Sequence, residues 1–410
     1  MDKYCISVKD RGILRQLAGK VAEYAAHPRE DRKRTLWTLH NDLKTSEPVV
    51  FIDPEGGWRE IFPPESLTCE GEIARQWEEE LRRRIYHIEN LKDDFVVDSI
   101  FSIPYVYEED GWGLDIIHEG VRTGGAYHVK PAIEDYEEDF EKLHFPNLIV
   151  DYMASDRLLA LAQETFGDIL HVERYMMWWW SLGMTRWFID LRGLENFLCD
   201  FIAEPEWFHR MMDFFCTGAL KRIDELEKKN LLFSNTENHY VGSGGFGFTE
   251  ELPLIRGTAN AKDIWGFVES QETSTVSHDM YGEFIFPYHK RILERFGMNC
   301  FGCCEPFEGR WKYAKQLPRL RRISCSPWSD RALAADLLRD KYIISHKLSP
   351  TPLATFEMNE AEVRRNLRAV LDHAQGTIPE LIMKDNHTLG KNPMNAVRWV
   401  ELAREEIANT

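Results

Sequence analysis

The fold is decided by a series of short apolar runs: IWGFV (264–268), MNCFG (298–302), RISC (322–325), YIIS (342–345) and LIM (381–383). Stretches with helical periodicity, such as residues 278–296 and 360–375, separate these runs. Three similar runs come earlier, at residues 95–100, 169–177 and 231–235. Strand, helix and strand repeated in this way predict a parallel sheet with helical crossovers.

Eight such units predict closure of the sheet into a (β/α)8 TIM barrel, an α/β fold. A doubly wound open sheet is the alternative. The first ninety or so residues have a different character, because they are highly charged and helical in period, apart from a short extended piece at residues 48–52. We therefore expect an N-terminal helical extension over residues 1–94, packed on a barrel formed by residues 95–410.

The composition fits a large globular enzyme. Of 410 residues, 43% are hydrophobic and 29% charged, which is enough to bury a sizeable core. A formal charge of −18 argues against binding to nucleic acid or to an anionic membrane, because both need clustered basic residues. No apolar run reaches the ~20 residues that span a bilayer. Eight cysteines without a recognisable secretory signal predict reduced thiols in a cytoplasmic protein.

Thiol, carboxylate and imidazole groups follow two of the predicted strands. Cys303, Cys304 and Glu305 follow the fifth strand, and Asp385 and His387 follow the eighth. Active sites of such barrels lie where the strands end, and the fifth and eighth strands face each other across that mouth. Residues two apart on a strand share a face, so the side chains at 303 and 305 are expected to point together.

These groups predict a zinc-type metal site, because tetrahedral zinc accepts thiolate, imidazole and carboxylate ligands. The predicted ligands are Cys303, Cys304, Glu305 and His387. The alternative is that the two cysteines are small buried hydrophobic residues and that His387 caps the last helix.

Further candidates lie at the ends of the third and fourth strands. Glu269 and Gln271 share a face, so Glu269 could act as a general base while Gln271 orients a substrate. We predict Glu269 and His239 as catalytic residues. His239 and Tyr240 precede the glycine-rich run 242–247, which could cradle an anion, form a flexible loop or close as a lid over the mouth.

Aromatic residues crowd the segment 175–180, YMMWWW. Such clusters line pockets for planar rings and attract methylammonium groups through cation–π interactions. We expect Trp178 and Trp180 to line a substrate pocket together with Tyr240 and Gln271, while Met176 and Trp179 pack in the core.

Three blocks of sequence carry a family resemblance: YGEFIFPY (281–288), GCCEP (302–306) and IMKDNHT (382–388). In their order and placement they resemble the uroporphyrinogen decarboxylase superfamily, over roughly residues 95–410. That superfamily also contains zinc methyltransferases that act with corrinoid proteins, and the chain looks most similar to this branch. The resemblance implies methyl transfer between a small methylated substrate, methoxylated aromatic or methylamine-like, and a corrinoid carried by a partner protein.

The chain departs from the family's decarboxylases. These carry an Arg-Gln-Ala-Gly-Arg segment whose arginines hold the porphyrin's acetates, whereas residues 15–20 here read RQLAGK. The corrinoid-linked enzymes end the corresponding strand with His-x-Cys, where this chain has Cys303 and Glu305. Two alternatives stay open: a metal-free decarboxylase-like lyase using Arg174, Arg186 and Arg192, and a non-catalytic ligand-binding barrel. The sequence also leaves open a homodimer.

Overall fold

The computed structural model describes residues 4–120 and 127–410 of the chain. The principal strands are β1 (Val49–Ile52), β2 (Ile100–Ile103), β3 (Val106–Glu109), β4 (Ile117–Gly120), β5 (Tyr127–Lys130), β6 (Leu148–Asp151), β7 (His171–Arg174), β8 (Tyr240–Val241), β9 (Gly245–Phe246), β10 (Trp265–Val268), β11 (Met298–Phe301), β12 (Leu320–Cys325), β13 (Ile343–Lys347) and β14 (Ile378–Met383). The helices are α1 (Val8–Ala25), α2 (Pro28–Asn41), α3 (Trp58–Ile61), α4 (Glu72–Tyr86), α5 (Tyr136–Asp139), α6 (Tyr152–Phe166), α7 (Thr185–Arg192), α8 (Leu194–Ala203), α9 (Pro205–Lys228), α10 (His278–Phe284), α11 (Phe286–Leu293), α12 (Trp311–Ala314), α13 (Arg331–Leu338), α14 (Glu360–Leu371) and α15 (Met394–Ala408).

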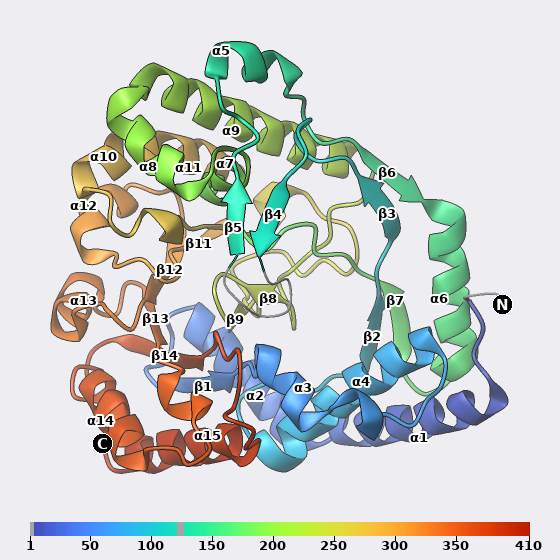
Figure 1. Ribbon diagram of the computed structural model, residues 1–410. Helices are drawn as coiled ribbons and strands as arrows, with labels where there is room; N and C mark the ends of the chain where they lie inside the picture. Colours follow the sequence, from blue (N-terminus) through green and yellow to red (C-terminus); the bar gives the residue numbers. More distant parts are fainter. Residues whose placement is uncertain (1–3, 121–126) are drawn as a thin grey trace.

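A parallel sheet forms the centre of the molecule. Its six strands run in the order β1-β14-β13-β12-β11-β10, and β2 and β7 form a separate parallel pair. Figure 1 shows these strands around a ring, with most helices outside it and the β8–β9 hairpin within. Every residue of β10, β11, β13 and β14 is buried, as in strands covered on both faces. The predicted mixed α/β fold with a central parallel sheet is therefore confirmed.

Residues outside any strand, through side chains and some backbone groups, bond the two outer edges of the six-stranded sheet. Beside β10, the side-chain amide of Asn235 accepts a hydrogen bond from the backbone N–H of Trp265 (2.9 Å). It also donates one to the backbone carbonyl oxygen of Trp265 (3.1 Å). Beside β1, the carboxylate of Asp94 accepts from the N–H of Val50 (2.8 Å). Among the described residues, strand pairing therefore does not run continuously around the ring.

Two of the predicted strands are wrong for this reason. Residues 95–100 are irregular until β2 begins at Ile100, and residues 231–235 make only one antiparallel bridge, between Phe233 and Thr258. By contrast, the extended piece at residues 48–52 is β1, which pairs in parallel with β14. The segment 1–94 thus supplies a strand to the sheet, and the boundary at residue 94 stays a prediction.

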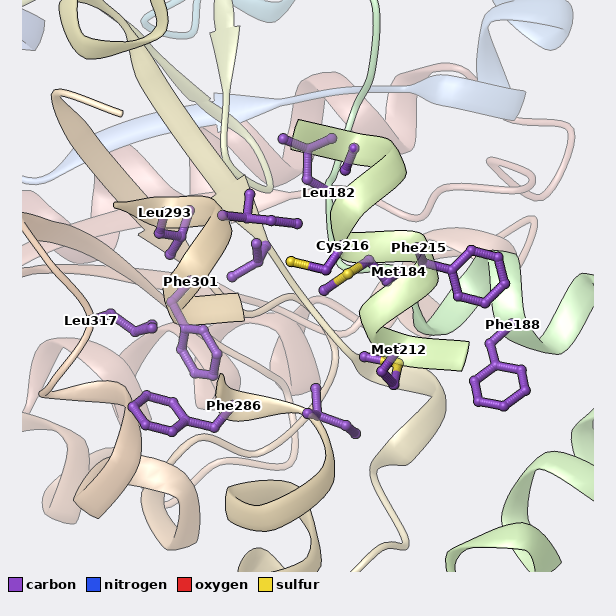
Figure 2. Close-up of a cluster of buried hydrophobic side chains, with 14 of the residues drawn as sticks. Leu182, Met184, Phe188, Met212, Phe215, Cys216, Phe286, Leu293, Phe301 and Leu317 are labelled. Atoms are coloured by element: carbon purple, nitrogen blue, oxygen red, sulfur yellow. The ribbon is translucent and has the colours of Figure 1, made fainter. Parts of the chain in front are cut away.

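The main apolar core lies between the sheet and helices α7 to α11. The helix α9 buries Met211, Phe215 and Ala219 along one face, at the spacing of an amphipathic helix. Figure 2 shows Met212, Phe215 and Cys216 of α9 close to Met184. No helix in the part of the chain that the structure describes is long and apolar enough to cross a membrane.

The glycine-rich run lies inside the ring, and its movement as a lid stays a prediction. Residues 241–248 are all buried. The amide of Asn41 holds the run by donating to the carbonyl oxygens of Phe246 (2.8 Å) and Phe248 (2.6 Å). Gly244 has a φ of +118° and lies against Ile382 of β14, a position that an L side chain could not occupy without strain.

Replacing Gly247 with alanine should destabilise the protein. The new Cβ would lie 1.7 Å from the backbone carbonyl oxygen of Asn235. The side chain of the same asparagine bonds the edge of β10, so a shift of this residue would also disturb the sheet. We expect a loss of about 1–3 kcal/mol in the free energy of unfolding, measured in urea. Gly12→Ala is the matched control, because no atom lies within 4 Å of its Cβ position in α1 and alanine favours the helix. Equal stability of the two variants would contradict the packing described here.

Candidate active site

A cavity of about 630 Å³ opens beside the carboxyl end of β10. Five tryptophans line it: Trp112, Trp178, Trp179, Trp180 and Trp187. Its polar lining consists of Glu109, Ser181, Arg186, Arg222, Glu269, Gln271 and Glu272. A mainly aromatic pocket with few polar groups is the usual form of a small-molecule site. We call it the tryptophan cavity.

The tryptophan wall is built from the segment that follows β7, and hydrogen bonds fix it in place. The indole N–H of Trp178 donates to the carbonyl oxygen of Leu231 (2.6 Å). The N–H of Leu182 donates to the carbonyl oxygen of Phe267 in β10 (3.0 Å). Trp180 packs edge-on against the Phe267 ring at 5.3 Å. The wall is therefore tied to the strand that carries Glu269.

Two cations already lie over this wall. The guanidinium of Arg222 is 5.4 Å from the Trp178 ring and is paired with Glu109 at 2.8 Å. The ammonium of Lys384 is 5.3 Å from the Trp180 ring. The electron-rich faces of these two indoles are thus engaged by the protein's own positive charges.

Glu269 is the buried acid of the cavity. Its side chain follows β10, the residue is 3% exposed, and its carboxyl accepts one hydrogen bond, from the N–H of Gln271 (3.0 Å). Burial, followed by the charges of Glu272 and Glu305, raises the pKa of Glu269 well above its ordinary value. The raised pKa favours the protonated form of this carboxyl, which is the form that can donate a proton.

Gly183 holds the tryptophan wall against this acid. A Cβ at Gly183 would lie 2.0 Å from the carbonyl oxygen of Glu269. His289 holds Gly183 close to Glu269, because its Nε2 lies 3.0 Å from the Gly183 carbonyl oxygen. Burial lowers the pKa of His289 to about 4, so a neutral ring donates this bond through an N–H on Nε2.

The two adjacent cysteines lie next to Glu269, at the end of β11. Their sulfur atoms are 3.7 Å apart. Cys303 is buried and also contacts the hydroxyl of Ser243 at 3.1 Å, whereas Cys304 is half-buried and its sulfur lies 3.8 Å from Oδ2 of Asp385. The neighbouring thiol of Cys304 and burial raise the pKa of Cys303, so it is a neutral thiol.

The other two predicted metal ligands differ in their surroundings. Glu305 is fully buried, and its carboxylate accepts from the N–H groups of Ser270 (2.8 Å) and Cys303 (2.9 Å). His387 has an exposed side chain. Within residues 4–120 and 127–410, no group of three or more His, Cys, Asp and Glu side chains is arranged to hold a metal ion. The predicted set therefore does not fit zinc in this structure; the zinc site stays a prediction, and no step proposed below depends on it.

The structure separates the two predicted catalytic residues. His239 lines a second cavity on the other side of residues 175–180, where its ring stacks on Tyr175 at 3.8 Å, and Glu269 does not line that cavity. Tyr240 also lines the second cavity rather than the tryptophan cavity. Trp178, Trp180, Gln271 and Glu269 do lie together around the tryptophan cavity.

Several cavity residues were missed from the sequence. Trp112, Trp187 and Arg222 come from helices or irregular segments far from any predicted strand end, and no pattern marks them. Glu272 could have been found, because it follows Glu269 by three residues at a predicted strand end. Its carboxylate accepts a hydrogen bond from the hydroxyl of Thr185 at 2.9 Å. Trp179 lines the cavity too, although it was predicted to be a core residue.

Comparison with known proteins gives matches in structure but none in sequence. No family model and no curated protein matches this chain. Among solved structures, the chain is similar to a methyltransferase from Methanosarcina mazei, with a TM-score of 0.50 and 10% sequence identity. The match covers 92% of this chain and 99% of the methyltransferase. At this identity the likeness concerns the fold.

Proposed function

We propose that the protein transfers a methyl group from a small methoxylated aromatic compound to a corrinoid carried by a second protein. The observation that carries the proposal is the tryptophan cavity with a buried carboxyl of raised pKa, Glu269, in its wall. The fold that the chain shares with a methyltransferase is consistent with it. So is the volume of about 630 Å³, which lies in the usual range for small-molecule sites.

The charges around the cavity favour a neutral or anionic ring over a methylated ammonium. A cationic donor would compete with Arg222 and Lys384 for the faces of Trp178 and Trp180. Moreover, the raised pKa of Glu269 weakens it as a counter-charge for a cation, and Glu109 is already paired with Arg222. A flat methoxylated ring needs no counter-charge and can pack against the tryptophan side chains that line the cavity.

In the proposed reaction, Glu269 acts as a general acid. The bond between the ether oxygen and the methyl carbon breaks as the methyl group passes to the acceptor. The oxygen takes the proton of Glu269 and leaves as a phenol, and the resulting carboxylate recovers a proton from water. A reduced corrinoid supplies the nucleophile that accepts the methyl group. The tryptophan wall excludes water and holds the ring, while Gly183 keeps that wall against the acid.

The arginines argue against the decarboxylase-like alternative. A substrate with several carboxylates needs several unshared cations, yet Arg192 is bound in a buried pair with Asp200 (2.7 Å). Arg174 donates to the carbonyl oxygens of Pro104 (3.0 Å) and Ser155 (2.9 Å). Only Arg186 of the three candidates lines the cavity.

The proposal is tested by supplying a methoxybenzoate and chemically reduced free cobalamin to the purified protein. Release of the hydroxybenzoate with an equal amount of methylcobalamin supports methyl transfer. Decarboxylated product, or binding without any turnover even when a corrinoid protein is supplied, would replace the proposal with the lyase or the non-catalytic alternative.

Trp180→Ala should weaken binding of the methoxybenzoate. The substitution removes one wall of the cavity and the stacking surface that it offers. We expect the dissociation constant to rise about threefold to tenfold, as followed by quenching of tryptophan fluorescence. Trp328→Ala is the control, because Trp328 is 78% exposed and does not line the cavity. An equal effect of the two substitutions would rule out the tryptophan cavity as the binding site.

A further inference from the structure

Two adjacent thiols, Cys303 and Cys304, have no role in the reaction proposed above. They lie in a bend at residues 303–305, and Gly302 before the bend has a φ of +84°. On an extended chain, neighbouring side chains point to opposite faces. The bend instead brings the two sulfur atoms to 3.7 Å from each other. The chain therefore places a pair of thiols side by side at the carboxyl end of β11.

The two thiols differ in their access to solvent. Cys304 is half-buried, whereas Cys303 is only 2% exposed. The sulfur of Cys303 lies 3.1 Å from the hydroxyl oxygen of Ser243, which holds it in place. A soluble oxidant would therefore meet Cys304 first and find Cys303 fixed behind it.

The surroundings of Cys304 suit a reactive thiol. Its sulfur lies 3.8 Å from Oδ2 of Asp385, so the carboxylate can accept the proton of the thiol. The ammonium of Lys384 lies 3.6 Å from the other oxygen of Asp385, and a positive charge near a thiol favours the thiolate. An accessible cysteine next to a second, resolving cysteine is the usual arrangement of redox-sensing thiols.

We propose that Cys303 and Cys304 form an oxidation site, in which a peroxide converts the two thiols reversibly into a disulfide. In the first step, Cys304 passes its proton to Asp385, and the thiolate attacks one oxygen of hydrogen peroxide. The O–O bond breaks as the S–O bond of a sulfenic acid forms. The hydroxide that is released takes the proton from Asp385 and leaves as water.

In the second step, the sulfur of Cys303 attacks the sulfur of Cys304. The S–S bond forms, the S–O bond breaks, and the hydroxide leaves as water with the proton of Cys303. The two thiols lose two electrons and two protons in total, and one peroxide is reduced to two molecules of water. The reaction needs no metal and no other cofactor.

The disulfide of two adjacent residues is strained and therefore easy to reduce. The Cα atoms of a disulfide are usually about 4.4–6.8 Å apart, whereas neighbouring Cα atoms across a trans peptide are about 3.8 Å apart. Strained disulfides are the labile, regulatory ones, so a thiol reductant should restore the pair. Such a transient bond also agrees with a chain whose cysteines are otherwise free.

The pair is linked to Glu269 through the carboxylate of Glu305. This carboxylate accepts hydrogen bonds from the N–H of Cys303 (2.9 Å) and from the N–H of Ser270 (2.8 Å), the residue after Glu269. Closure of the disulfide would twist the peptide between residues 303 and 304 and shift this bridge. We expect the oxidised protein to release the phenol more slowly, a consequence that rests on the proposed function.

Mass spectrometry after alkylation in denaturant tests the oxidation site. The protein is first treated with a chelator, so that a bound metal ion cannot mask the thiols, and then with hydrogen peroxide. The tryptic peptide 296–310 should become lighter by two hydrogen atoms and should not fragment between residues 303 and 304. Dithiothreitol should restore both thiols.

Serine variants test the order of the two steps. Cys303→Ser should retain a sulfenic acid on Cys304, which dimedone traps, because no resolving thiol is present. Cys304→Ser should form no disulfide in this peptide. Cys199→Ser is the matched control, because it removes an exposed cysteine of α8 and should behave as wild type. Thermal unfolding shows whether each variant is folded, and the wild-type result stands without them.

Two results would overturn the oxidation site: both thiols remain free in wild type while Cys199 is oxidised, or the disulfide joins Cys300 or a second chain. An unchanged rate of phenol release in fully oxidised protein would overturn the link to Glu269. Absence of methyl transfer by the reduced protein is a different result, which concerns the proposed function and leaves the mass-spectrometric test in force.

Discussion

Glu269→Gln lowers the rate of phenol release from a methoxylated aromatic by about a hundredfold to ten-thousandfold, the usual contribution of a positioned general acid. Glutamine fills the same space and accepts the same hydrogen bond from the N–H of Gln271, but it cannot transfer a proton. The change should therefore appear in kcat, with little change in KM. Steady-state kinetics of hydroxybenzoate release give both constants.

The stability of this variant separates a chemical role from a structural one. Because burial raises the pKa of Glu269 in the folded protein, this carboxyl costs stability above its unfolded pKa, so the neutral glutamine should keep or raise the unfolding midpoint at neutral pH. Glu195→Gln, on the exposed side of α8, serves as the control for both activity and stability. A Glu269→Gln enzyme that retains the wild-type rate would remove Glu269 from the mechanism.

The pH profile provides an independent check on the same residue. A general acid works while protonated, so activity should fall as the pH rises through the raised pKa of Glu269. The residual activity of Glu269→Gln should lack this limb of the profile. Identical profiles for the two proteins would assign the limb to another group.

The sequence predicted the sheet where backbone pairing forms it. Strands β10 to β14 are buried on both faces, so they stand out as short apolar runs between helical segments. The runs at 95–100 and 231–235 look the same but are not regular strands, because Asp94 and Asn235 bond the neighbouring strand edges through their side chains. Hydrophobicity marks burial, and it does not show which group makes a hydrogen bond.

Site residues were predicted correctly where side chains keep alternating in direction beyond the end of a strand. The prediction is weaker where a left-handed residue interrupts that alternation. Glu269 and Gln271 follow β10, and both line the tryptophan cavity as expected. After β11, Gly302 has a φ of +84°, which turns the chain before residue 303. The Glu305 carboxylate is bound to the backbone N–H groups of Ser270 and Cys303, and whether it shares a ligand with the Cys303 thiol stays a prediction.

The same effect occurs after β14. Asp385 has a φ of +60°, and this left-handed residue reverses the direction of the side chains that follow. Asp385 reaches Cys304, while His387 faces solvent. Sequence alone gives no warning of such a turn at an aspartate. Strand alternation therefore does not predict the directions of side chains beyond a left-handed residue.

Glu380→Leu should be the most destabilising single substitution considered, with a loss of about 3–5 kcal/mol in the free energy of unfolding. Glu380 lies in β14 and is fully buried, with its carboxylate 3.1 Å from Nε of Arg322 in β12 and 3.4 Å from His40. Removing the carboxylate leaves the guanidinium buried without its counter-charge. Its remaining hydrogen bond to Asn41 (2.6 Å) cannot replace that charge.

The double variant Arg322→Met/Glu380→Leu distinguishes a lost charge partner from lost packing. If the cost comes from the uncompensated guanidinium, removing both charges should restore most of the stability, measured by urea unfolding. The neighbouring Lys347 does not prevent this, because burial lowers its pKa to about 8 and it can lose its own charge. A double variant as unstable as Glu380→Leu would mean that shape, rather than charge, sets the cost.

Acid unfolding tests the Arg322–Glu380 pair without a substitution, because low pH protonates the carboxylate of Glu380. Burial alone would raise the pKa of Glu380, but Arg322 and His40 lower it below the ordinary value. A carboxyl with a lowered pKa in the folded state adds stability above its unfolded pKa and loses it as the pH falls further. Wild type should therefore lose stability below about pH 4 more steeply than the double variant, which lacks this group. Parallel curves for the two proteins would show that the pair contributes nothing to acid sensitivity, and the polar interior of the sheet would then need another explanation.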